Sequence, residues 1–140
     1  MQITKNSLET NAGPGDWFTD AVYIDTIASP SQESRVGAAS VHFTPTARTA
    51  SHTHPHGQTI WVTEGVGLCQ REGGPIEVIR PGDRVFFEPG ENDWHGAAAT
   101  RLMTHIAIQQ ANDDGNVVTW GEHVSDEQYA RAPSIAEAAR

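Results

Sequence analysis

The stretch His52-Thr53-His54-Pro55-His56-Gly57-Gln58 is the most informative part of this sequence, and an apolar run to Thr63 follows it directly. Alternate side chains of an extended segment point to the same side, so the three histidines and Gln58 would share one face. Neutral imidazole binds divalent zinc, manganese, iron, nickel and copper alike, so this face indicates a metal site. Pro55 and Gly57 interrupt the regular pleat, however, and the same residues also fit a histidine-rich surface loop that binds nothing.

Short apolar segments surround this stretch on both sides, and turn signals separate them. The turns are Gly73-Gly74-Pro75, Pro81-Gly82-Asp83 and Pro89-Gly90-Glu91-Asn92. The expected strands cover Val36–Thr44, Gln58–Thr63, Gly67–Arg71, Ile76–Arg80, Arg84–Phe87 and Leu102–Gln109, with a first strand formed by Trp17-Phe18 and Ala21–Ile27. Short strands at near-regular spacing predict an all-β sandwich or barrel.

Helical signals appear only near the end of the chain. Ser125 and Gln128 have the spacing of a capping box, which predicts a short C-terminal helix through Ala130 that Pro133 ends. The tail over residues 134–140 is expected to form a second short helix or a frayed end.

Composition narrows the functional classes. The 140 residues fit one domain, 1–140, and the net charge of −9 comes without a cluster of Lys and Arg, which excludes nucleic acid as a partner. No apolar run approaches the ~18 residues that a membrane helix needs, and no signal-peptide pattern is visible, so we expect a cytoplasmic protein with no membrane partner. Cys69 stands alone, which excludes an internal disulfide and predicts a buried, inert thiol.

His105 is a second candidate functional residue. Alternation places it on one face with Met103 and Ala107. A core histidine bonded to the backbone is one interpretation; the other is a general base, since no Asp, Glu or Lys is placed to accept a proton. An imidazole near its usual pKa of about 6.5 suits that task at neutral pH.

The cavity wall is predicted from the same alternation. Ala39, Val41 and Phe43 share the more apolar face of their strand, so His42 falls on the outside. The remaining wall candidates are Ile60, Phe87, Trp94 and Met103. His56 and His123 are not expected to be ligands. The small side chain of Ala39 leaves room for a small-molecule substrate.

The stretch from His52 to Gln58, followed by six residues and then Gly65, resembles the first cupin motif. The second cupin motif is resembled by Pro81-Gly82-Asp83, Pro89-Gly90 and His95. The resemblance covers about residues 36–110. It implies a single-domain antiparallel β-barrel of the jelly-roll type, with terminal extensions, that holds one divalent metal through His52, His54, Gln58 and His95. Most cupins have Glu where this chain has Gln58, so a bound ion would keep its full charge of +2 and act as a stronger Lewis acid.

A closer resemblance extends over nearly the whole chain. The stretches 52–59, 70–74, 94–97 and 103–105 look like the bacterial cupin hydroxynitrile lyases. That resemblance implies a manganese ion, with iron, zinc, nickel or cobalt as alternatives, and His105 as the base in a pocket lined by Ala39 and Val41. The implied reaction is the reversible cleavage of a cyanohydrin to a carbonyl compound and cyanide.

Other functions are compatible with the same set of metal ligands. A metal-assisted isomerase or lyase on a hydroxy-carbonyl compound needs the same Lewis acid and base, and a non-haem dioxygenase needs a metal that changes its oxidation state. A ligand-binding cupin without turnover is the non-enzymatic alternative. The outward-facing Ile106 and Ile108, together with Trp17-Phe18, predict a homodimer or larger homo-oligomer.

Overall fold

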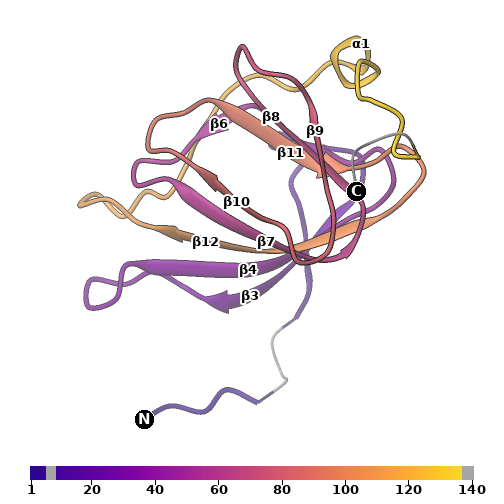
Figure 1. Ribbon diagram of the computed structural model, residues 1–140. Helices are drawn as coiled ribbons and strands as arrows, with labels where there is room; N and C mark the ends of the chain where they lie inside the picture. Colours follow the sequence, from indigo (N-terminus) through magenta and orange to yellow (C-terminus); the bar gives the residue numbers. More distant parts are fainter. Residues whose placement is uncertain (6–8, 137–140) are drawn as a thin grey trace.

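Two antiparallel β-sheets face one another in the computed structural model, which describes residues 1–5 and 9–136 (Figure 1). The first sheet has the order β1-β3-β4-β12-β7-β10, and the second has the order β13-β6-β11-β5-β2, with β8 beside β11 and β9 beside β8. The strands are β1 Asn11–Ala12, β2 Phe18–Thr19, β3 Val22–Ala28, β4 Val36–Phe43, β5 Arg48–Thr49, β6 His52–Thr53, β7 Gln58–Gly65, β8 Gly67–Arg71, β9 Glu77–Ile79, β10 Arg84–Phe87, β11 Asp93–Ala97, β12 Met103–Gln110 and β13 Thr119–Trp120. The prediction of an all-β jelly roll is confirmed.

The structure adds one long strand that the sequence did not reveal, β11. Its five residues, Asp93–Ala97, are all buried, and they include Asp and Gly, which are depleted in strands. Strands with one solvent-exposed face show alternation of apolar and polar residues. Since β11 is covered on both faces, it shows no such pattern.

The C-terminal helix α1, Asp126–Tyr129, begins where the capping box predicted. The Ser125 side chain accepts a hydrogen bond of 3.1 Å from the Gln128 backbone N–H. Of the predicted tail helix, the structure describes only the beginning, where residues 135–136 form a turn; residues 137–140 lie outside the described residues. Within the described ranges, no helix is long and apolar enough to cross a membrane.

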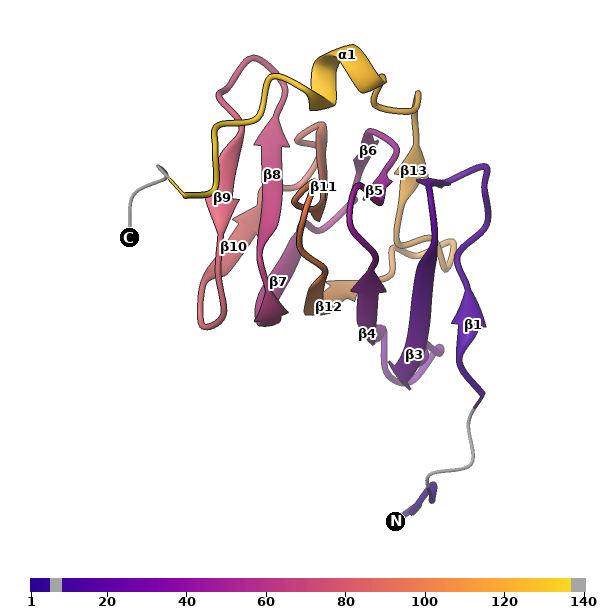
Figure 2. The ribbon, with the colours of Figure 1, turned by 90° about the vertical axis from the view of Figure 1, so that its right-hand side faces the viewer.

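Buried side chains form two clusters, one on each side of the second sheet. The larger cluster fills the space between the sheets and includes Phe18, Phe43, Ile60, Phe87 and Met103. The smaller one combines Leu68, Trp94, Val124 and Tyr129, and α1 lies over it close to β8 and β11 (Figure 2). Each face of β11 therefore has its own hydrophobic environment.

Gly65 ends β7 at a point where the chain leaves no room for a side chain. Its φ is +80°, and a Cβ atom there would lie 1.8 Å from the carbonyl oxygen of Leu102. Any other residue would be strained in this conformation and would push β12 away. The glycine of the first motif thus allows the β7–β8 turn to lie close to the start of β12.

Candidate metal centre and cavity

Three short elements bring polar side chains together between the two sheets. His52 is in β6, His54 follows it in the turn, and Gln58 is the first residue of β7. All three side chains are buried. On the neighbouring strand of the same sheet, Asp93 of β11 pairs directly with His52, and His95 lies two residues further on the same side of β11.

Hydrogen bonds to neighbouring residues fix how the predicted ligands are oriented. His52 Nδ1 donates to the carbonyl oxygen of Ala50 at 2.8 Å, and His54 Nδ1 donates to that of Val117 at 2.7 Å. A carbonyl oxygen only accepts, so the hydrogen of each neutral ring is on Nδ1 and the lone pair on Nε2. A hydrogen bond from the ring nitrogen that faces away from the ion is typical of metal-binding histidines.

Gln58 is oriented in the same way. Its amide nitrogen donates to Gln109 Oε1 at 3.0 Å, which leaves the carbonyl oxygen as the free atom. That oxygen, His54 Nε2 and His95 Nε2 are buried, and among the described residues none has a hydrogen-bond partner. Buried polar atoms are rarely left unpaired, because the cost is about 1–3 kcal/mol each. Several unpaired donor atoms facing one space fit a divalent metal.

Asp93 is the residue of this centre that the sequence analysis missed. Its side chain is 0% exposed, and its Oδ1 lies 3.5 Å from His52 Nε2. Burial raises the pKa of Asp93 to about 8, and the charge of Glu91 adds to this rise. The prediction that no acidic side chain is placed near His105 and the ligands is therefore wrong. Its spacing of two residues from His95 was the signal that could have revealed it, once β11 was recognised as a strand.

His105 of β12 is in direct contact with His95. Its Nε2 lies 3.1 Å from His95 Nδ1, its side chain is 1% exposed, and its Nδ1 has no partner in the described part of the chain. Burial lowers the pKa of His105 to about 3 and that of His95 well below its usual value. The prediction of an ordinary histidine pKa is wrong, because the imidazole is fully enclosed and stays neutral near pH 7.

A small apolar cavity of about 170 Å³ opens beside these groups. Ala39, Val41 and Phe43 of β4 line it, together with His105 and the four predicted ligands. Ile60, Phe87 and Met103 are instead buried in the core between the sheets, outside the lining of this cavity. The volume limits an occupant to a small molecule.

Trp94 lies on the other side of β11 and is not part of the cavity wall. It belongs to the cluster with Tyr129, and its Nε1 donates to Gln70 Oε1 at 2.7 Å. Strand alternation explains the placement, because His95 points into the barrel and its neighbour must point out. The prediction for Trp94 as cavity wall is therefore wrong, because β11 was not among the expected strands and the direction of the side chain depends on it.

The rest of the wall comes from residues that the sequence analysis did not assign to the site. Trp120 of β13 lines the cavity, stacks on Trp17 with ring centroids 5.3 Å apart, and lies 4.9 Å from the His52 ring. Phe18 also lines the cavity and is 8% exposed, whereas the prediction placed it on an outer surface. These residues come from both ends of the chain, and the pairing of β13 with β6 brings Trp120 to the predicted ligands.

The remaining histidines lie outside the centre. His56 and His123 are exposed. His42 is on the outer face of the first sheet, where its ring contacts Asp25 at 2.9 Å and Thr104 at 3.2 Å.

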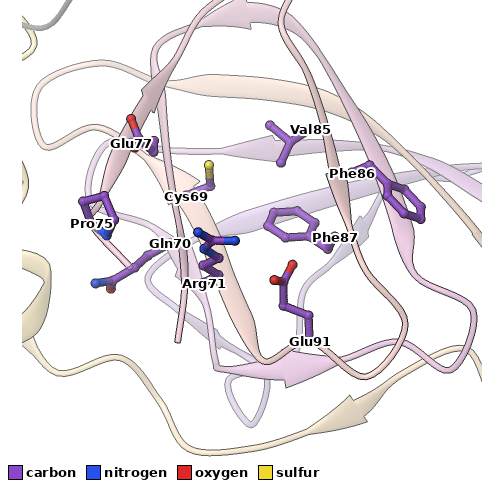
Figure 3. A pocket seen from close by; sticks show the side chains of 9 residues that line it. All are labelled: Cys69, Gln70, Arg71, Pro75, Glu77, Val85, Phe86, Phe87 and Glu91. Carbon is purple, nitrogen blue, oxygen red and sulfur yellow. The ribbon is translucent and has the colours of Figure 1, made fainter. Parts of the chain in front are cut away.

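A second cavity of about 260 Å³ lies on the other side of Phe87 (Figure 3). Phe87 lines it, and the same ring stacks on His95 with centroids 5.5 Å apart. Figure 3 shows the Cys69 thiol in this wall, with Arg71 and Glu91 beside the Phe87 ring. Cys69 is 6% exposed, which agrees with the predicted buried thiol.

The fold agrees with the comparisons to known proteins. The family model described as "Cupin domain" matches residues 39–102. The chain belongs to the cupin family. A protein of Granulicella tundricola named (R)-mandelonitrile lyase is 56% identical over 132 residues, which cover 94% of this chain and 100% of the relative.

Solved structures show the same fold. A cupin-like protein from Thermotoga maritima is 31% identical, with a TM-score of 0.81 over 91% of this chain and 97% of the other. A polyketide cyclase from Streptomyces resistomycificus is 14% identical, with a TM-score of 0.63 over 92% of this chain and 89% of the other. This second likeness concerns the fold alone.

Proposed function

We propose that the protein is a metal-dependent carbon–carbon lyase that reversibly cleaves a cyanohydrin to a carbonyl compound and cyanide. The observation that carries this proposal is the group of unpaired, buried donor atoms beside His105 in a small apolar cavity. The relative from Granulicella tundricola, named (R)-mandelonitrile lyase, supports it at 56% identity. A small aromatic cyanohydrin such as mandelonitrile is the substrate class that fits.

We propose His52, His54, Gln58 and His95 as the ligands of one divalent ion, with manganese as the expected metal. Imidazole and amide ligands also suit iron, zinc, nickel and cobalt. When bound, the ion supplies a positive charge that stabilises negative charge developing on the substrate. Gln109 and the carbonyl oxygens of Ala50 and Val117 hold three of these ligands in position.

His105 acts as the base in this proposal. The neutral imidazole accepts the proton of the cyanohydrin hydroxyl, and a carbonyl group forms as the bond to the nitrile carbon breaks. The electron pair of that bond leaves with cyanide, which takes up the proton. In the reverse direction the same group takes the proton of hydrogen cyanide and returns it to the new hydroxyl.

The apolar wall has two effects on this chemistry. Val41 and Phe43 exclude water, so the charges of the reacting groups are poorly screened and their interactions are stronger. The small Ala39 leaves space for the substituent on the carbinol carbon. A larger residue at position 39 is expected to change which cyanohydrins are accepted.

The test is a mandelonitrile cleavage assay on protein reloaded with each candidate metal. His105→Ala is expected to lower turnover by about 100-fold or more while metal binding persists, and Gln58→Ala is expected to lower both. Full cleavage activity in either metal-loaded variant would contradict the proposal.

We also propose that the protein forms a homo-oligomer through the outer face of the first sheet. Trp61, Phe86 and Ile108 of neighbouring strands are 46%, 52% and 43% exposed there. Such apolar side chains on adjacent strands are typical of an interface. Light scattering is expected to show a dimer or larger assembly that Trp61→Glu dissociates; a monomeric wild-type protein would contradict this.

A further inference from the structure

One buried carboxylate of the centre has no part in the reaction proposed above. Asp93 stands directly opposite His52 in the pairing of β6 with β11. Its side chain is 0% exposed, and the described residues give neither carboxylate oxygen a hydrogen-bond partner. Burying a carboxylate without donors or a cation is costly, so a compensating group is expected at this place.

The neighbour of Asp93 identifies what that group is. His52 Nε2 lies 3.5 Å from Asp93 Oδ1, and the hydrogen of the His52 ring is on Nδ1, where Ala50 accepts it. A neutral His52 therefore presents a lone pair to the carboxylate. When Asp93 is ionised, its oxygens and this lone pair can only accept hydrogen bonds and do not stabilise each other, whereas a cation ligated by both stabilises the carboxylate.

The third member of this group is His95. Ligand atoms of His52, Asp93 and His95 all lie within 4.8 Å of one another. That spacing is compatible with one shared ion, since nitrogen and oxygen ligands bind divalent metals at about 2.0–2.2 Å. The two β11 residues reach the same space because they are two positions apart on one strand.

We propose that Asp93 is the anionic ligand of the metal centre, an inference that rests on the metal dependence proposed above. Its charge compensates for the neutral amide of Gln58. The bound ion then has a net charge of +1 with its ligands, where Gln58 and the histidines alone would leave +2. The centre binds its metal more tightly than a fully neutral set and is a milder Lewis acid.

The first test measures the affinity of the metal-free protein for Mn²⁺ by calorimetry. Asp93→Asn keeps the shape of the side chain and removes its charge, and it is expected to raise the Kd by roughly 10-fold or more. The matched control is Asp25→Asn, which removes the same charge from the outer face of the first sheet and is expected to leave the Kd unchanged.

The second test compares the melting temperatures of Asp93→Asn and wild type in the metal-free and the Mn²⁺-bound states. Without metal, Asp93→Asn is expected to melt at the same or a higher temperature than the wild type, because it removes a buried carboxyl group that lacks partners. With Mn²⁺ present it is expected to melt at a lower temperature. A holo variant as stable as the holo wild type would contradict the inference.

A measurement on the unaltered sequence does not depend on the folding of any variant. In Mn²⁺-loaded wild-type protein carrying ¹³C in its aspartate carboxyl groups, electron–nuclear double resonance is expected to show one strongly coupled carboxyl carbon. Absence of this coupling, or equal Mn²⁺ affinity of wild type and Asp93→Asn, would overturn the role of Asp93 and leave the proposed lyase intact. A wild-type protein that binds no divalent metal would overturn both.

Discussion

The two faces of β11 differ in whether their polar atoms have hydrogen-bond partners. On the outer face, Trp94 Nε1 donates to Gln70, and Tyr129 OH donates to the carbonyl oxygen of Ala97 at 2.6 Å. On the inner face, both oxygens of Asp93 and Nε2 of His95 have no partner among the described residues. The same five-residue strand therefore has a satisfied face and an unsatisfied one.

Arg48 extends the satisfied face. It is 2% exposed, its guanidinium donates to the Val124 carbonyl oxygen at 2.8 Å and to Asp126 at 2.8 Å, and it lies 4.5 Å from the centre of the Tyr129 ring. These contacts hold α1 on the sheet. We infer that the outer face serves stability, whereas the unpaired polar atoms of the inner face fit the metal ion proposed above.

The largest expected effect comes from the inner face. His95→Ala removes a proposed ligand and the partner of His105, so cyanohydrin turnover is expected to fall by about 100-fold or more. The metal-free protein is also expected to melt at a lower temperature, since the variant removes a 3% exposed ring that stacks on Phe87, so turnover is compared per folded molecule. Turnover near the wild-type level, measured with Mn²⁺ present, would contradict the assignment of the inner face to the reaction.

The adjacent residue on the outer face is expected to behave in the opposite way. Trp94→Ala removes a 2% exposed ring and its hydrogen bond, so the free energy of unfolding should fall by about 3–5 kcal/mol. Chemical denaturation measures this loss, and Trp94→Phe is the milder control. Turnover per folded molecule, assayed well below the melting transition, should stay within about two-fold; a large loss would show that the faces are coupled.

A smaller effect is expected from Tyr129→Phe. The variant keeps the ring that packs on Trp94 and removes only the hydroxyl group that donates to Ala97. The free energy of unfolding is expected to fall by about 1 kcal/mol, with metal affinity unchanged. An equal loss in Tyr129→Ala would mean that the ring contributes nothing, contrary to its place in the cluster.

The smallest effect concerns Cys69, which pairs with His95 across β8 and β11. Burial, with the nearby charges of Glu77, Asp93 and Asp83, raises the pKa of the Cys69 thiol to about 12. The neutral thiol's contribution to stability is complete below the usual cysteine pKa of 9.0 and is lost as the pH rises toward 12. Alkylation by iodoacetamide at pH 8 is expected to be far slower in folded than in unfolded protein; equal rates would show that water enters this side of the barrel.

Much of the fold was predictable because most strands have one solvent-exposed face. β4, β7 and β12 show an alternation that identifies both their extent and their direction. β11 has no solvent-exposed face, and for that reason its limits, the outward direction of Trp94 and the position of Asp93 beside His52 all escaped prediction. One unrecognised strand explains these three failures.

The site itself divides in the same manner. His52, His54 and Gln58 stand close together in sequence, so local spacing together with the resemblance to the first cupin motif led to their prediction as ligands. Trp120 reaches the cavity only through the pairing of β13 with β6, which no local pattern reveals. The pKa of His105 depends on complete enclosure by both sheets, and this too is a property of the assembled barrel.

The position of β12 determines when the site can form during synthesis. This strand lies between β4 and β7 and pairs with both along most of its length. Until residues 103–110 leave the ribosome, the first sheet has a gap in its middle, and the edges of β4 and β7 are unpaired. The histidines of residues 52–58 are therefore synthesised before the strand that completes the cavity around them. In a nascent chain that stops before β12, we expect these imidazoles to bind divalent metals without selectivity.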